Sequence, residues 1–584
     1  MNGLGQSSVS SKSQSHLFSR VSTSNAVEYS TFDTPVGWHG TIDSGYLIPI
    51  CCIETVPGDI LKLKSSHLIR PASALQVPIM QNMYVCYEFY YVKYRYIWDN
   101  WKKLMGEQRN PNDSTDYLVP TLNTGSSGVE RRSIFDCFGI RANGKNYEFN
   151  TLGLRAYNLI YNYWYRDQNL QTWKNIGGTG TTDSPVDEFG DSDQLSNYQL
   201  LKRNKSHDYF TSMLPWQQKG DPVIMNLSTG TVPVFGNGMT LGLMSGSNST
   251  GSDVKAGLGY SSEDNLRLYP NVYGLETGNS SIGTGASLST RSVGVTNEPE
   301  YSGLIADLSN VNGISISDFR TAIQVQAIKE LEARTGTRYQ EKIEGGFKVK
   351  IADAELGVPE ILASYKQAFY TTPIAQTSAT TETINETPQG NLAAVSHAFL
   401  DRGYDFVKAF DDFGVVIGIL SITTDNYYQQ GLHRKWSRKT KYDFYHPLLQ
   451  HISEQPVKRK ELIILNDDDV DENGNSINES TLGYQEAWAE YKYGENIITG
   501  DFVSNPDDPS ISLDRYHLAE YFDPDTTKLN GEFIEYNIPL DRVLAITGTE
   551  ENPQPQFLVD SSMDCKFTRP MARYSVPWSF GGRF

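Results

Sequence analysis

Basic and aromatic side chains alternate in one short stretch of this chain, residues 433–445, which reads HRKWSRKTKYDFY. Its cations and two of its rings are Arg434, Lys435, Arg438, Lys439, Lys441, Trp436 and Tyr442. Cations that neutralise phosphates, placed beside rings that stack on bases, are the combination that binds single-stranded nucleic acid. The same cations would equally suit a subunit interface in which they meet acidic neighbours. The sequence leaves both interpretations open.

Two shorter basic clusters offer weaker versions of the same chemistry. One contains Lys202, Arg203 and Lys205, and the other spans residues 458–460. The chain as a whole is acidic, with 69 Asp and Glu against 50 Lys and Arg and a formal net charge of −19. Because nucleic-acid affinity comes mainly from neutralised phosphates, we expect any DNA contact to be local and to face away from the acidic surface.

An acidic loop resembles part of a calcium site. Asp469, Asp471 and Asn473 match the first half of an EF-hand loop, but Ser480 stands where the bidentate acid belongs and Glu479 is one place early. No pair of flanking helices is evident. A solvated acidic loop is therefore the favoured interpretation, and an irregular Ca²⁺ site is the alternative.

Catalytic motifs are absent from the sequence. Residues 139–146 approach a phosphate-binding P-loop, but Asn146 stands where Ser or Thr must hold Mg²⁺. His433, His446 and His451 lack Cys or carboxylate partners at the spacing of a zinc site. No GxSxG, HExxH or CxxC motif occurs. We expect no enzymatic activity, and no cofactor beyond the Ca²⁺ alternative.

The elements that must position these residues are mostly β-strands. The chain contains 49 Gly and 26 Pro, which is typical of turn-rich β structure. The strand candidates are residues 83–98, 415–423, 461–465, 533–538 and 541–547. Apolar residues at helical spacing predict a helix over 152–172 and a second one that starts at Ser315 or Ser317 and stops near Gly336. The apolar stripe of the second helix is Phe319, Ala322, Ile323, Ala327, Ile328 and Leu331.

Strand candidates this widely spread favour one β-domain with large insertions over several independent domains. We expect a flexible, Ser-rich arm over residues 1–26 and a single all-β domain over 27–584. Residues 226–297, dominated by Gly, Ser, Thr and Asn, are expected to form a variable surface insertion. An antiparallel jelly roll tolerates such insertions, because its loops gather at the ends of the sandwich.

Cysteine usage and hydropathy indicate where the protein is made. The five cysteines, Cys51, Cys52, Cys86, Cys137 and Cys565, are odd in number and unevenly scattered, which favours reduced structural thiols. The first 25 residues lack the apolar core of a signal peptide, and no run of 18 apolar residues occurs. We expect synthesis in a cytoplasm and no membrane insertion.

Several strings together resemble one known family. They are GYLIP at 45–49, ETVPGD at 54–59, LRAYNLIYNYWYRDQNLQ at 154–171, NKSHDYFTSMLPWQQKGDPV at 204–223, GTRYQE at 336–341, YDFYHP at 442–447 with EQP at 454–456, and GYQEAWAEY at 483–491. In this order they resemble the major capsid protein of microviruses, particularly of the gokushovirus-like branch. One glycine, at Gly336, replaces the pair that usually precedes T-R-Y.

The resemblance implies a structural role. It implies an eight-stranded antiparallel jelly roll whose long loop insertions contain some helices, and sixty copies of it would close a T=1 shell around single-stranded DNA. The partners would be a small basic packaging protein, a DNA pilot protein and a host surface receptor. The 226–297 insertion would form a protrusion at the three-fold axes. The protein would be made in the bacterial host cytoplasm and end in the virion.

The alternative function is a phage spike or another glycan- or receptor-binding β-protein. The chain contains 35 Tyr and 9 Trp, and such rings also line sugar-binding grooves. Particle formation by the chain, or glycan binding without particles, separates the two.

Overall fold

The computed structural model describes residues 29–574 with gaps, the largest of which cover most of 224–315 and all of 376–391. The chain divides into two compact units. The first contains residues 1–217 and 332–584, and the second contains residues 218–331. The expected arm at 1–26 lies outside the described residues.

A four-stranded antiparallel sheet forms the centre of the first unit. Its strands are β16 (Glu360–Ala368), β5 (Met83–Lys93), β20 (Gly414–Thr424) and β3 (Ile48–Thr55), in this spatial order. Every residue of β20 is buried, and so is every residue of β5 except Tyr84. Burial on both faces explains why these two strands read as near-continuous apolar runs. The strand predicted over 415–423 is confirmed, whereas the one predicted over 83–98 is too long, because the chain turns into η3 (Tyr94–Tyr96) after β5.

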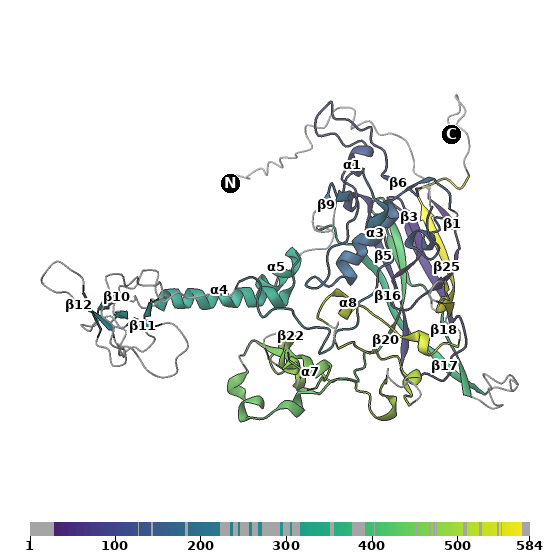
Figure 1. The fold of residues 1–584 in the computed structure, drawn as a ribbon. Helices are drawn as coiled ribbons and strands as arrows, with labels where there is room; N and C mark the ends of the chain where they lie inside the picture. Colours follow the sequence, from purple (N-terminus) through teal and green to yellow (C-terminus); the bar gives the residue numbers. More distant parts are fainter. Residues whose placement is uncertain are drawn as a thin grey trace, which may run out of the picture. The chain divides into compact units, whose positions relative to one another are not determined.

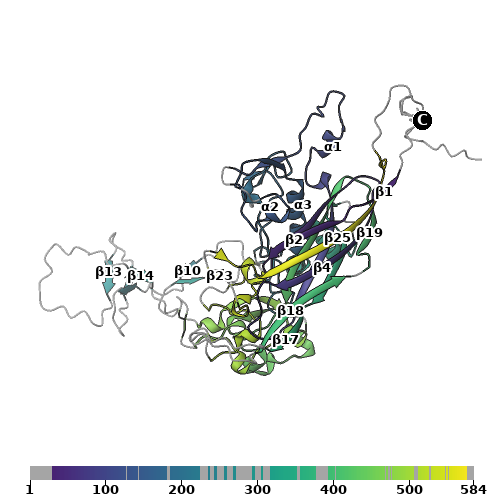
Figure 2. The same cartoon turned by 90° about the vertical axis from the view of Figure 1, so that its right-hand side faces the viewer.

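A seven-stranded sheet forms the second layer. Its strands are β17 (Tyr370–Ala375), β18 (Leu392–Asp401), β4 (Ile60–Pro71), β25 (Phe557–Arg569) and β1 (Ser30–Asp33), with β19 (Phe406–Ala409) on β4 and β2 (Val36–Ile42) on β25. All of these pairings are antiparallel. Buried and exposed residues alternate along β4 and β25, so one face of this sheet contributes to the core and the other meets solvent. Figure 2 looks onto β2, β25, β4 and β18 lying side by side.

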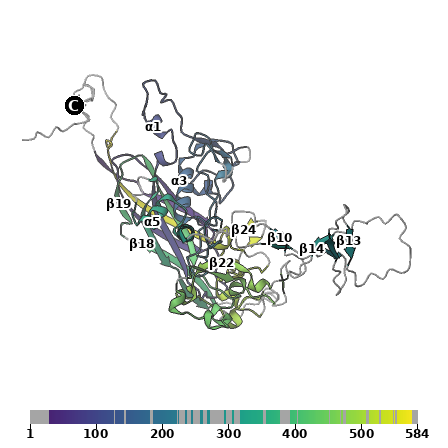
Figure 3. The ribbon, with the colours of Figure 1, turned by 90° about the vertical axis from the view of Figure 1, so that its left-hand side faces the viewer.

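Two hydrophobic cores enclose the four-stranded sheet. The first core, between the sheets, joins Leu61 and Leu63 of β4 to Val85 and Phe89 of β5. The second core covers the opposite face, where α3 (Leu152–Ile160) packs on β5 and β20. Figure 1 shows α3 beside β3 and β5, with β1 and β25 beyond them, and Figure 3 views α1 (Trp101–Leu104) and α3 from the side away from the seven-stranded sheet.

The helix predicted over 152–172 is shorter than expected. It runs as α3 to Ile160, continues as one π-helical turn, η4 (Tyr161–Tyr165), and ends where Arg166 becomes extended. The Asp167 carboxylate then accepts hydrogen bonds from the N–H groups of Asn169 and Leu170, at 2.8 and 2.9 Å. This side chain to backbone turn offers an alternative to further helical bonds.

The second predicted helix is confirmed in its position. α4 spans Ile316–Thr335, and Gly336 follows it at a φ of +92°, a left-handed conformation that glycine adopts without strain. The predicted stripe is not a buried face, because Phe319, Ile323 and Ile328 are each 47–57% exposed.

Three predicted strands are wrong. Residues 461–465 fall at the end of the short helix α7 (Arg459–Leu462), residues 533–538 begin in α8 (Gly531–Ile534), and residues 541–547 begin in the turn η14 (Leu540–Arg542). Several of their apolar side chains are nevertheless buried; Leu462, Ile463, Phe533 and Ile534 belong to a third core with Tyr209 and Phe210. A short apolar run indicates burial without specifying a strand.

Three antiparallel strand pairs occur among the described residues of the second unit. β10 (Val234–Gly236) pairs with β15 (Leu304–Ala306), β11 (Leu243–Ser245) with β14 (Val293–Val295), and β12 (Ala256–Gly259) with β13 (Arg267–Pro270). Most of the predicted insertion at 226–297 lies outside the described residues, so its role stays a prediction.

The described structure is therefore built mostly of antiparallel sheets with few helices, which confirms the β-rich part of the fold prediction. The five cysteines are all free, and burial raises the pKa of the Cys565 thiol to about 11. Among the described residues, no helix is both long and apolar enough to cross a bilayer.

Candidate nucleic-acid interface

The basic stretch at 433–445 folds as two short turns. η7 spans Arg434–Ser437 and η8 spans Lys441–Asp443. The His433 Nδ1 accepts a hydrogen bond from the Lys435 N–H at 3.1 Å, and the Asp443 carboxylate accepts from the N–H groups of Lys439 and Thr440. Local side chain to backbone hydrogen bonds thus hold the loop that carries the cations.

Two of the five cations are committed to buried carboxylates. The Arg434 guanidinium lies 3.2 Å from Glu461, and the Arg438 guanidinium lies 3.0 Å from Glu490. Both glutamate side chains are only 2% exposed, so each needs a cationic partner to offset its desolvation. Arg434 and Arg438 therefore stabilise the fold of this region.

The other three cations stay at the surface. Lys435, Lys439 and Lys441 are exposed, and no ion pair joins them to a carboxylate in the described part of the chain. The Lys435 ammonium lies 5.3 Å from the centre of the Trp436 ring, and the Lys441 ammonium lies 4.9 Å from that of Tyr442. These rings are 71% and 66% exposed. The arrangement leaves cations and aromatic faces open to the same solvent.

The second predicted cluster divides in the same way. Burial disfavours the Arg203 cation, but the combined effects of Glu88, Tyr165 and Cys86 raise the pKa of the guanidinium. Arg203 and Glu88 share two hydrogen bonds of 3.0 and 3.1 Å. Lys205 pairs with Glu520 at 2.5 Å. The Lys202 ammonium instead lies 5.7 Å from the centre of the Tyr46 ring.

The acidic loop of the predicted calcium site is only partly described. Asp469 is described, whereas Asp471 and Asn473 lie outside the described residues, so the predicted site stays untested. Glu479 already accepts hydrogen bonds from Lys458 and Lys460, which lower its pKa to about 2. Within the described ranges, no cluster of three metal-ligating side chains occurs.

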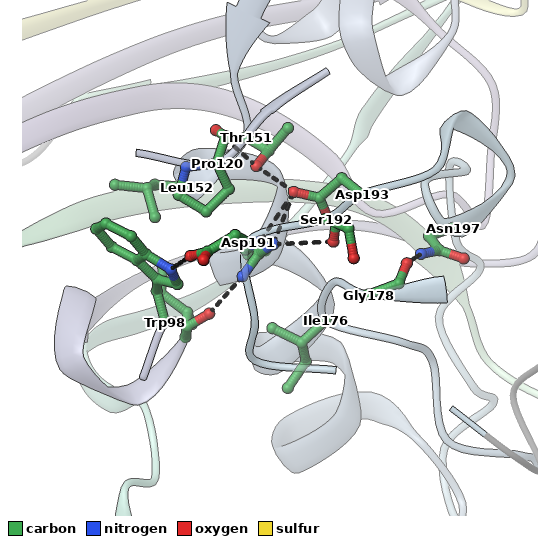
Figure 4. Close-up of polar contacts among 12 residues, drawn as sticks. Trp98, Pro120, Thr151, Leu152, Ile176, Gly178, Asp191, Ser192, Asp193 and Asn197 are labelled. Atoms are coloured by element: carbon green, nitrogen blue, oxygen red, sulfur yellow. Dashed lines mark hydrogen bonds and ion pairs between the residues drawn. The ribbon is translucent and has the colours of Figure 1, made fainter. Parts of the chain in front are cut away.

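One buried ion pair was missed by the sequence prediction. Arg155 and Asp193 are fully buried and lie 2.8 Å apart, and Arg155 also donates to the carbonyl oxygens of Ile97 and Ser192. The Thr151 hydroxyl donates to Asp193 as well, at 2.5 Å (Figure 4). The pair anchors the loop around Asp193 to α3 and so helps to keep the second core closed. A lone arginine in an otherwise apolar helix was the only signal in the sequence.

A neighbouring contact ties the same loop to the aromatic end of the central sheet. The Trp98 indole N–H donates to Asp191 at 2.6 Å (Figure 4), and the Asn100 amide also donates to this carboxylate. These polar contacts hold the loop in place beside the buried Trp98 ring.

Comparison with known proteins agrees with an assembly role. Residues 19–579 match the model of the family described as Capsid protein (F protein). The chain is 37% identical to capsid protein VP1 of Bdellovibrio phage phiMH2K over 578 residues, which cover 98% of this chain and 99% of that protein. It is 35% identical to capsid protein VP1 of Chlamydia phage 1, covering 96% and 97% of the two chains. For capsid protein VP1 of Spiroplasma virus 4 the identity is 33%, covering 91% and 92%.

These matches confirm the resemblance to microvirus capsid proteins and indicate a structural protein rather than an enzyme. They extend over both β-sheets and the insertions between them, and they cover nearly the full length of each relative. The chain belongs to the Capsid protein (F protein) family.

Proposed function

We propose that sixty copies of this capsid protein close a T=1 icosahedral shell around the single-stranded DNA genome of a small phage. The observation that carries the proposal is the match to capsid proteins over almost the whole chain in both directions. Closed symmetric shells need large, repeated interfaces, and the exposed aromatic side chains of the first unit are of the type that such interfaces use.

The fold proposed for this shell subunit is an eight-stranded jelly roll. In chain order its strands would be β2, β3, β4, β5, β16, the β17–β19 group, β20 and β25. The pairing supports this: one sheet runs first–eighth–third–sixth and the other runs second–seventh–fourth–fifth. Two interleaved Greek keys give this order. The additional strand β1 extends the first sheet beside β25.

The proposed contact with DNA is narrower than the sequence suggested. Lys435, Lys439 and Lys441, with Trp436 and Tyr442, are the exposed members of the basic stretch. In the other cluster, Lys202 is half-buried beside the Tyr46 ring and has no ion pair with a carboxylate in the described ranges. The paired cations of both clusters are assigned to folding. An acidic shell with so few free cations would depend on a basic packaging protein, and the pilot protein and host receptor are further proposed partners.

The proposal is tested by producing the full chain with and without its companion viral proteins and imaging the product by cryo-electron microscopy. We expect uniform icosahedral particles with sixty subunits and internal DNA density. Persistent monomers, or closed particles with another copy number, would overturn the shell proposal. Glycan binding by the chain without particles would favour the spike alternative instead.

A further inference from the structure

A cavity of about 430 Å³ lies within the first unit, away from the basic stretch at 433–445. Its lining comes from the end of η4 and the residues that follow it, from parts of the segments 203–214, 333–336 and 534–536, and from the strands β5, β16 and β20 through Cys86, Lys366 and Thr423. Trp164, one of the lining residues, is 40% exposed.

Cations dominate the wall of this cavity. The charged side chains that line it are Arg166, Arg203, Lys205, Arg334, Lys366 and Asp167. The only carboxylate among them, Asp167, already accepts the two backbone hydrogen bonds that close the turn after η4. The wall therefore presents many donors and little competing negative charge.

Three of the cations have carboxylate partners that do not line the cavity. Arg203 pairs with Glu88, Lys205 with Glu520, and Arg334 with Glu454 at 2.6 Å. Glu88 and Glu454 are only 8% and 6% exposed, so their charge lies behind the wall. The cations lie between these carboxylates and the cavity.

The other two cations have no such partner. No ion pair joins Arg166 or Lys366 to a carboxylate in the ranges that the structure describes. Arg166 donates to the Gln171 carbonyl oxygen at 2.8 Å and lies 5.4 Å from the centre of the Trp173 ring, but its buried Nε has no hydrogen-bond partner. Burial, followed by the positive charge of Arg338, lowers the pKa of Arg166. The negative charges of Asp167 and Glu341 act in the opposite direction. The observation that points to a ligand at this corner is therefore the buried Nε of Arg166, which has no hydrogen-bond partner among the described residues.

The far wall completes the arrangement. The Lys366 side chain is exposed, and its ammonium lies 3.8 Å from the centre of the Tyr84 ring. The Trp164 indole N–H donates to the Pro359 carbonyl oxygen at 2.9 Å, which holds this lining residue in place. A fixed, half-exposed indole that lines the same cavity as two cations offers a stacking face in addition to a place for a negative charge.

We propose that this cavity binds a phosphate group, with Arg166 and Lys366 as its anchors and Trp164 as a stacking face for an attached base. The phosphate belongs either to packaged single-stranded DNA or to a free nucleotide; assignment to DNA rests on the proposed function. No covalent step is involved. The cavity would be a second DNA contact, independent of Lys435, Lys439 and Lys441.

The test uses the full chain and three probes: a labelled oligothymidylate, thymidine monophosphate and inorganic phosphate. The variant R166Q/K366Q removes both anchors. We expect its affinity for the oligonucleotide to fall about tenfold at low salt, and its slope of log K against log salt to decrease by about 1.4, which corresponds to two lost phosphate contacts. Both smaller probes should compete with the oligonucleotide on the wild type and not on the variant.

A charge-matched control separates the cavity from the net charge of the chain. K62Q/K566Q removes two exposed lysines that face each other on β4 and β25, outside the cavity. If the control loses as much affinity as R166Q/K366Q, or if R166Q/K366Q binds every probe like the wild type, the cavity proposal is overturned. R166K, which keeps the charge, should retain most of the affinity and guards against misfolding of R166Q.

The three probes also distinguish packaged DNA from a free nucleotide as the source of the phosphate, and the cavity proposal from the shell proposal. Binding of the monophosphate without the oligonucleotide assigns the site to a free nucleotide. If the wild type forms no particles but binds phosphate, and R166Q/K366Q does not bind it, the cavity proposal stands and the shell proposal is overturned. If particles form but neither phosphate nor DNA binds at Arg166, the shell proposal stands and the cavity proposal is overturned.

Discussion

At the scale of single residues, the buried charges of this protein are held by several partners each. Arg155 is the clearest case, because Asp193, the Ile97 carbonyl and the Ser192 carbonyl all accept hydrogen bonds from it in a site without solvent. Desolvating two ions costs several kcal/mol, which is offset only when nearly every donor and acceptor is satisfied. The contribution of such a pair to stability is therefore measured by removing one partner, which leaves the other charge buried and unpaired.

We therefore expect R155M to lower the free energy of unfolding by about 3–5 kcal/mol, because it leaves Asp193 buried and unpaired. The double variant R155M/D193N removes both charges and should recover a large part of this loss. Urea denaturation followed by tryptophan fluorescence measures both. Equal stability of R155M and the wild type would show that Asp193 finds another partner or water.

Glu495 makes stability depend on pH near neutrality. Burial, followed by the negative charges of Glu461 and Asp208, raises its pKa to about 7 from a usual value of 4.5. A carboxyl group with a raised pKa in the folded state favours folding while it is protonated, and this contribution disappears as the pH rises from about 4.5 through about 7. The wild type should therefore lose stability across that window relative to a variant that cannot ionise.

E495Q should accordingly melt at the same temperature as the wild type at pH 5 and at a higher temperature at pH 8. Thermal melting at both pH values measures this, with E107Q, a change at an exposed glutamate, as the control. A difference between E495Q and the wild type that is the same at pH 5 and pH 8 would contradict the raised pKa.

At the scale of elements, whether a helix or strand could be predicted from the sequence depended on how that element is buried. β5 and β20 were predicted because burial on both faces leaves a continuous apolar run, and α4 was predicted because Gly336 marks its end. β25 was missed, because its alternating pattern, FLVDSSMDCKFTR, mixes each core residue with Ser, Asp or Lys. Its partners β1 and β2 lie more than 500 residues away in the sequence, and no local signal reports such a pairing.

The same limit applies to the candidate nucleic-acid interface. The composition of the basic stretch was readable from the sequence, but which cations remain free was not. Carboxylates elsewhere in the chain decide which cations remain free. Glu461 and Glu490 form ion pairs with Arg434 and Arg438, and Glu88 forms one with Arg203. Only the folded chain brings these partners together.

The division into free and paired cations predicts two different outcomes. K435Q/K439Q/K441Q should weaken binding of a labelled oligothymidylate and reduce the slope of log K against log salt by about 2, with no loss of thermal stability. R438Q should instead lower the melting temperature, because the buried Glu490 loses its nearer cation and keeps only Arg434, at 3.9 Å. Fluorescence anisotropy and thermal melting measure the two effects. Unchanged DNA binding by the triple variant would leave the subunit interface as the role of this stretch.

At the scale of the whole molecule, the exposed apolar surface points to assembly. Leu448 is 82% exposed, and Tyr445 and Tyr491 nearby are 48% and 52% exposed around Trp488. Trp488 has a φ of +68°, a left-handed conformation that costs a bulky residue about 1–3 kcal/mol. An aromatic cluster that is exposed and held at such a cost is expected to be covered in the functional state, and in a capsid the available cover is a neighbouring copy.

L448S/Y491S should therefore reduce the yield of particles several-fold and lower the melting temperature of the unassembled subunit only slightly, since Leu448 is 82% exposed and Tyr491 keeps half of its surface in solvent although it contacts Trp488 and Arg438 within one copy. L118S, at a leucine that is 84% exposed elsewhere in the first unit, is the matched control. Sedimentation analysis and electron microscopy count the particles. Wild-type yields from L448S/Y491S would mean that this cluster faces solvent in the shell, and the strain at Trp488 would then need a cause within the subunit. A loss of yield in L448S/Y491S but not in L118S would place the cluster between copies, because only a contact absent from the free subunit affects assembly without affecting folding.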